Sequence, residues 1–286
     1  MADYLKEFAH SKQKYPEEIL ASLKRQYDGY HFTWPSPDIF NPFSLLNSLQ
    51  DKQIKSYWFE TGTPTLLIEK LKEFHMLPSM LKPTWVMAPD FDAPTENMSS
   101  IMPLLYQAGY FTIKEYDEIS ELYLLDLPNN EIRIGLMQSL LPNYVQHNAM
   151  QGNTTIGMMN KALQQENLDE MLSLLQTYLL TIPQCDNTNY EGHYQQLLYV
   201  IFSLLGRYVD VEVRTSAGRI DMVMNSGKAI YLFELKLNKS AEAAMHQINL
   251  KDYPSRFALS GLPITKVGIN FDMERHTIAD WKIENH

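Results

Sequence analysis

The run AIYLFELKL, residues 229–237, constrains the fold of this chain more than any other segment. Its mainly apolar character predicts a strand at the centre of a sheet. Side chains alternate along a strand, so Glu234 and Lys236 share one face with Ile230 and Leu232. Because a buried charge needs a partner, a carboxylate and an amine in such a strand indicate a polar site within an otherwise apolar core.

The segments on both sides of this run predict a small α/β domain. Strands are indicated by alternation in VDVEVRT and GRIDMVM, and Asn225-Ser226-Gly227 is typical of a turn. The helix after the run has Asn238 or Ser240 as its N-cap. We expect a buried helix at 190–206, strands at 209–215, 218–224 and 229–237, a helix at about 240–250 and a last strand at 266–272.

Asp221 lies on the strand before the central one, between Ile220 and Met222. If the two strands pair across the turn, Asp221 approaches Glu234. Two nearby carboxylates in a partly apolar setting repel each other, and a divalent cation relieves that repulsion. Hard oxygen ligands favour Mg²⁺ or Mn²⁺. A lysine beside the metal can orient a water or help to deprotonate it, which is equipment for hydrolysing a phosphodiester.

An alternative interpretation is a structural one. Asp221, Glu234 and Lys236 would then form an ion network on an edge strand, with no catalytic role. The residues alone leave both interpretations open.

A known family resembles this arrangement. Its residues here are Glu191, Gly218-Arg219-Ile220-Asp221, Phe233-Glu234-Leu235-Lys236 and Gln247. They are similar to the PD-(D/E)xK nuclease superfamily. More narrowly, residues 188–284 resemble the nuclease-like domain that follows an AAA-ATPase-like domain in many bacterial proteins.

The resemblance implies a role for each of these residues. Asp221 and Glu234 would bind the metal, and Lys236 would be the catalytic lysine. It also implies that Glu191 assists metal or water binding and that the backbone carbonyl of Leu235 is a further ligand. Gln247 would lie near the substrate or the metal. We interpret His193 and His246 as neighbours of the site rather than ligands.

The N-terminal part resembles the same group of proteins. It is similar to the C-terminal part of the AAA-ATPase-like domain in YDGYHF, NPFSLLN, YWFETGTPTLLIEKL, PLLYQAGYFTIK and PNNEIR. A P-loop requires Gly-x4-Gly-Lys-Ser/Thr, whereas Gly152 to Gly157 is followed by two methionines. We therefore expect no ATP cofactor, and the chain resembles the back half of a longer architecture.

Local patterns in the N-terminal part predict a mainly helical region. Helices are indicated at 15–26, 43–50, 63–74, 95–108, 129–147 and 157–180, with an irregular 82–94 that includes a short strand at 85–87. Two strands at 110–114 and 122–127 complete a helix–hairpin–helix outline that resembles a winged-helix module. In YDGYHF we expect a turn at Asp28-Gly29 and packing roles for Tyr27, Tyr30 and Phe32.

Charge bears on which part could hold nucleic acid. The chain has 286 residues and a formal charge of −10. Residues 1–185 hold 13 basic and 22 acidic side chains, whereas residues 186–286 hold 11 and 12. Residues 94–147 contain seven acids against Lys114 and Arg133, which disfavours DNA binding by the hairpin module. Affinity in the C-terminal part would need local bases such as Arg214, Arg219, Lys239 and Lys251.

The remaining composition sets the class and the compartment. Cys185 stands alone, which excludes an intrachain disulfide and a Cys-based zinc site and fits a reducing, cytoplasmic compartment. We expect no secretory signal and no membrane span, because no long apolar run is present. We place domain limits at 1–147, 148–187 for a helical connector and 188–286.

These observations lead to one expected architecture and two functions. The fold class is α/β, with a mainly helical N-terminal region, its winged-helix-like hairpin, and a C-terminal restriction-endonuclease-like mixed sheet flanked by helices. The first function is a Mg²⁺- or Mn²⁺-dependent nuclease, with DNA rather than RNA as its partner. The second is a non-catalytic module of the same fold that needs a protein partner, a second copy or an ATPase half.

Overall fold

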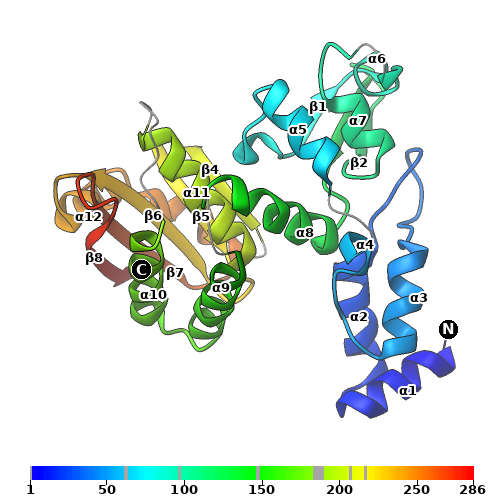
Figure 1. Cartoon of the computed structure of the whole chain (residues 1–286), viewed down its shortest axis with the longest axis horizontal. Helices are drawn as coiled ribbons and strands as arrows, with labels where there is room; N and C mark the ends of the chain where they lie inside the picture. Colours follow the sequence, from blue (N-terminus) through cyan, green and yellow to red (C-terminus); the bar gives the residue numbers. More distant parts are fainter. Residues whose placement is uncertain are drawn as a thin grey trace. The chain divides into compact units, whose positions relative to one another are not determined.

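The computed structural model describes residues 2–60, 64–95, 98–145, 149–182, 190–205, 208–215 and 218–286. For residues 60, 149–151, 190–192, 208, 211–215 and 218–220 it describes only the course of the backbone. The chain forms two compact units, Met1–Ser139 and Leu140–His286. We call them the N-terminal and the C-terminal unit (Figure 1).

The N-terminal unit is mainly helical, as predicted. A small sheet of order β1-β3-β2 lies among its helices, with both pairs antiparallel. One core cluster joins Phe8, Ile19, Leu23, Tyr27 and Leu49. The elements are α1 (Ala2–Lys12), α2 (Pro16–Tyr27), α3 (Pro42–Asp51), α4 (Tyr57–Glu60), α5 (Thr65–Glu73), η1 (Pro78–Met80), β1 (Thr84–Val86), α6 (Ala88–Phe91), α7 (Met102–Gln107), β2 (Thr112–Asp117), β3 (Leu122–Asp126) and α8 (Asn130–Leu140).

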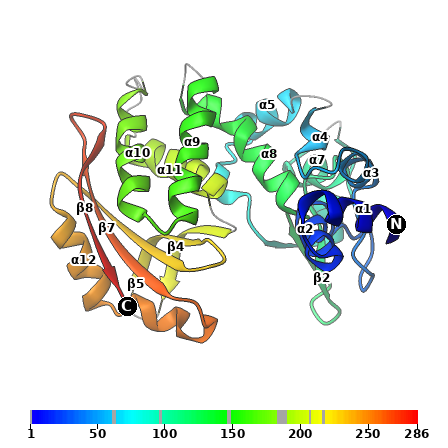
Figure 2. The same ribbon diagram turned by 90° about the horizontal axis from the view of Figure 1, so that it is seen from below.

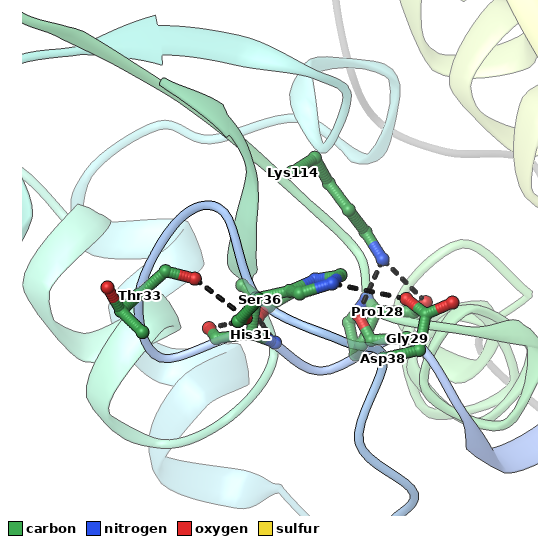
Figure 3. A network of polar contacts seen from close by, with 8 residues as sticks. Gly29, His31, Thr33, Ser36, Asp38, Lys114 and Pro128 are labelled. Carbon is green, nitrogen blue, oxygen red and sulfur yellow. Dashed lines mark hydrogen bonds and ion pairs between the residues drawn. The ribbon is translucent and has the colours of Figure 1, made fainter.

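A half-buried lysine joins three segments of this unit. Lys114, on β2, donates from Nζ to the carbonyl oxygens of Gly29 at 2.6 Å and Pro128 at 3.1 Å. Figure 3 shows its ammonium group directed at both carbonyls, beside the ion pair of His31 and Asp38 at 3.2 Å. Gly29 has a φ of 98°, which explains why glycine stands there, but residues 28 and 29 are not in the turn that the sequence predicted.

The C-terminal unit is a five-stranded mixed sheet between helices. The strand order is β4-β5-β6-β7-β8, and every pair is antiparallel except β6–β7. A parallel connection needs a crossover, which α12 and η4 provide. The elements are η3 (Leu141–Asn143), α9 (Ala149–Gln164), α10 (Leu168–Leu180), α11 (Tyr190–Leu205), β4 (Tyr208–Thr215), β5 (Gly218–Asn225), β6 (Ile230–Leu237), α12 (Ala241–Leu250), η4 (Tyr253–Ser260), β7 (Ile264–Asp272) and β8 (Thr277–Asn285).

Helices cover both faces of this sheet. On one face, α12 packs against β6 and β7, whereas α10 and α11 lie against the other face (Figure 2). The approach of α12 is close, because a Cβ at Gly268 of β7 would lie 2.6 Å from the carbonyl oxygen of Ala241. The expected mixed sheet with flanking helices is therefore confirmed.

Several sequence predictions need correction. The helix expected at 95–108 is only α7, because Pro103 is accommodated in a first turn and not in a helix interior. The first strand of the hairpin begins at Thr112 rather than at residue 110. Residues 266–272 are not the last strand, since β8 follows, and α1 was not predicted. Phe32, expected to pack, is 70% exposed.

Candidate metal and phosphodiester site

The central strand carries its charged residues on the face that α12 covers. Ile230 and Leu232 pack into one cluster with Met245 and Ile248 of α12. Phe233 points the other way and packs against Phe202 of α11, with ring centroids 4.7 Å apart. Glu234 therefore lies between the sheet and α12, and it is only 1% exposed. Since β6 is the middle strand, the edge-strand alternative for this segment is wrong.

Asp221 lies near Glu234, one residue beyond the last pair of the β5–β6 ladder. The β5–β6 ladder pairs Val223 with Leu232 and Met222 with Phe233, so the next residues in that register are Asp221 and Glu234. Directly opposite residues share a face of the sheet. The Asp221 carboxylate accepts a hydrogen bond from the Leu235 N–H at 2.8 Å, so a side chain bonds to this amide where the ladder ends.

A chain of hydrogen bonds runs from Glu234 into α12 and η4. Lys236 Nζ donates to Glu234 Oε1 and to Gln247 Oε1, both at 2.7 Å. Gln247 Nε2 in turn donates to the hydroxyl of Tyr253 at 3.4 Å. The predicted residues Glu234, Lys236 and Gln247 are thus in direct contact, and Gln247 is not a surface glutamine.

Electrostatics make Glu234 the unusual group of this set. Burial, together with the nearby negative charge of Asp221, raises the pKa of Glu234 to about 7, against the opposing effect of Lys236. Its second oxygen, Oε2, is buried and has no hydrogen-bond partner among the described residues. A buried carboxylate oxygen without a partner costs free energy unless a proton or a cation satisfies it.

Comparison with known proteins agrees with this geometry. The family model described as the PD-(D/E)XK nuclease superfamily matches residues 189–281. This segment is a PD-(D/E)XK nuclease superfamily domain. It contains α11, α12, strands β4 to β7 and the part of β8 through Trp281.

A relative extends the similarity beyond this nuclease-superfamily domain. It is the "uncharacterized protein in vnfD 5′ region" of Azotobacter chroococcum mcd 1, which is 31% identical over 274 residues. The match covers 92% of this chain and 52% of the relative. The chain therefore spans about half the length of that protein.

The other predicted residues of the PD-(D/E)XK domain differ in what can be said of them. Glu191 lies in the first turn of α11, and its side chain falls outside the described part. The side chains of Arg214 and Arg219 also fall outside the described part. His246 is exposed on α12, and His193 contacts the ring of Tyr144, with centroids 5.5 Å apart.

The donor set of the domain fits a hard divalent cation. Two carboxylates lie near each other on β5 and β6, and one of them keeps an unpartnered buried oxygen. Mg²⁺ commonly binds through one or two carboxylates and keeps several waters. Within the described residues no group of three or more His, Cys, Asp or Glu side chains forms a ready metal site, so waters or backbone oxygens would complete this one.

The sequence did not indicate a role for Tyr253, and it indicated Lys251 only as a local base for nucleic-acid affinity. Tyr253 is fully buried and closes the hydrogen-bond chain, and Lys251 lies over its ring. Their position depends on Asp252, whose φ of 41° turns the chain back beneath α12. An aspartate tolerates that conformation, but nothing in the local pattern required it.

No helix in the described parts of the chain is long and apolar enough to cross a membrane.

Proposed function

We propose that this chain is a divalent-metal-dependent nuclease that hydrolyses DNA phosphodiesters. The observation that carries the proposal is Glu234, a carboxylate held in the core near Asp221 with one oxygen unpartnered. Asp221, Glu234 and the carbonyl of Leu235 would hold Mg²⁺ or Mn²⁺, with Glu191 assisting. Within a strand, the N–H and C=O of one residue point to the same side. The carbonyl of Leu235 therefore points toward β5, where Asp221 lies.

The bound cation would supply charge stabilisation for the phosphoryl group and a more acidic water. Lys236 would orient the attacking water or a phosphoryl oxygen. A protonated lysine has three N–H donors, and two of them bind Glu234 and Gln247. The third has no partner among the described residues, so it is available for the attacking water or a phosphoryl oxygen. Gln247 fixes the direction of this donor from α12.

Plasmid cleavage tests the proposal. We expect wild-type protein to cut supercoiled DNA with Mg²⁺ or Mn²⁺ and to leave it intact in EDTA. Lys236→Ala should lower the rate by about 100-fold or more. Lys161→Ala is the matched control, because Lys161 is exposed on α9, which packs with α10 and α11. RNA offered in parallel tests the preference for DNA.

Two outcomes would contradict this assignment. Equal cleavage by Lys236→Ala and wild type would place the activity elsewhere. No cleavage, together with no heat of Mn²⁺ binding and an unchanged fold of Asp221→Ala, would favour the second function, a non-catalytic module that acts with a protein partner or a second copy.

We also propose that the N-terminal unit corresponds to the back part of an AAA-ATPase-like region, with domain limits at 1–147, 148–187 and 188–286. The proposal rests on the resemblance of the motifs in YDGYHF and NPFSLLN. Co-expression of this chain with a P-loop-containing AAA-ATPase domain, followed by a test for ATP-stimulated cleavage, would check it.

A further inference from the structure

A second cation lies beside the carboxylates, and the chemistry above does not use it. Lys251 follows the last residue of α12 and is half-buried. Its Nζ lies 6.0 Å from the ring centroid of Tyr253. Among the described residues this ammonium group has neither a hydrogen bond nor an ion pair. Its positive charge nevertheless reaches Glu234, whose pKa it lowers.

The backbone fixes where this cation can act. The left-handed conformation of Asp252 brings Tyr253 back beneath α12, where its ring is fully buried. The hydroxyl of that ring accepts from Gln247, which binds Lys236. Lys251, which follows α12, therefore lies on the same face of the sheet as Lys236, over the ring of Tyr253 that ends the hydrogen-bonded chain.

The two lysines differ in what remains free. Lys236 is committed to Glu234 and Gln247 and has one donor left. Lys251 contacts only a ring face, which leaves its N–H donors available to an anion from solvent. The ring face attracts the ammonium group and restricts its position. Such a group suits a phosphate that approaches two carboxylates, which by themselves would repel it.

We propose that Lys251 is a substrate-binding residue, whose ammonium group contacts a backbone phosphate of nucleic acid at the Asp221–Glu234 site. The inference rests on the proposed nuclease function. It assigns to Lys251 the sequence-independent part of binding, in which a lysine displaces counterions from one phosphate. Tyr253 positions the lysine, and Lys236 serves the reacting phosphoryl group.

The test measures binding without cleavage. Anisotropy of a fluorescent DNA duplex would be followed in Ca²⁺, which takes oxygen ligands, at several NaCl concentrations. Lys251→Met keeps the aliphatic stem on Tyr253 and removes the charge. We expect it to weaken binding at low salt by about five- to tenfold, and to reduce the slope of log affinity against log salt by about 0.9. Lys251→Arg should restore both.

Lys161→Met is the control, because it removes one exposed positive charge from α9, among the helices on the sheet face opposite α12. It should leave the affinity and the slope unchanged. Wild-type-like binding by Lys251→Met, or an equal loss in Lys161→Met, would overturn the inference. If wild type cleaves and binds DNA while Lys251→Met binds equally well, only this inference fails. If wild type neither binds nor cleaves, the proposed function fails with it.

Discussion

Glu234 is a single side chain whose pKa is strongly raised. In the metal-free protein its pKa is raised to about 7 by burial and by Asp221, above its ordinary value of 4.5. The folded state therefore binds a proton more tightly than the unfolded state does. The stability this gives is complete below about pH 4.5 and is lost as the pH rises through about 7.

The first prediction concerns this loss. In EDTA, wild type should lose roughly 3 kcal/mol more unfolding free energy than Glu234→Gln between about pH 5 and about pH 8. Urea unfolding at both pH values measures the difference. Added Mn²⁺ should recover stability in wild type at the higher pH and not in the variant. Equal pH dependence of the two proteins would show that Glu234 titrates normally.

In the N-terminal unit, Lys114 is a charged residue with a structural role. Its two hydrogen bonds to the carbonyls of Gly29 and Pro128 join the segment after α2 to the loop before α8. Lys114→Met keeps the stem and leaves both carbonyls without this donor. It should lower the unfolding free energy by about 2 kcal/mol. Lys72→Met on α5, where the lysine is exposed, should change it little.

At the scale of elements, two glycines should respond in opposite directions to the same substitution. Gly268→Ala places a methyl group against the backbone of Ala241 and Met245, so α12 must move away from β7. The expected cost is about 1–3 kcal/mol. Gly157→Ala on α9 meets no atom within 4 Å and should stabilise the helix by up to about 1 kcal/mol. Thermal unfolding distinguishes the two signs, and a stabilising Gly268→Ala would contradict the close approach.

The elements that local pattern determines were predictable from the sequence. The alternation in residues 229–237 identified the faces of β6, and Asn225-Ser226-Gly227 set the β5–β6 register that brings Asp221 to Glu234. Strand periodicity and a short turn are local properties, so this part of the site followed from them. The contact of Lys236 with Gln247 needs the crossover helix to pack back onto the sheet, which the family resemblance implied.

Other features depend on contacts distant in the sequence. Helix α1 buries only Phe8 and Ala9, which is too weak a stripe to stand out from the sequence. Tyr253 reaches Gln247 only because Asp252 adopts a left-handed conformation, and no local signal demands that. By contrast, Pro103 and the alternation in TIADWKIEN are local signals for a shorter α7 and for β8.

For the molecule as a whole, the division into two compact units predicts two unfolding transitions in calorimetry. Ligand binding stabilises only the unit that binds it. Mn²⁺ should therefore raise one transition temperature, and this should be the one that Gly268→Ala lowers. Lys114→Met should lower the other. A single transition that moves with every change would show that the two units unfold together.

The hydrogen bond from Leu235 to Asp221 gives one backbone amide a value as a spectroscopic reporter. When a carboxylate shares its electrons with a cation, it becomes a poorer acceptor, and the amide proton bonded to it is less deshielded. In ¹⁵N-labelled protein the Leu235 resonance should therefore move upfield during a Mg²⁺ titration, before any nucleic acid is added. Ion occupancy would then be measurable at this single amide, in protein to which no nucleic acid has been added.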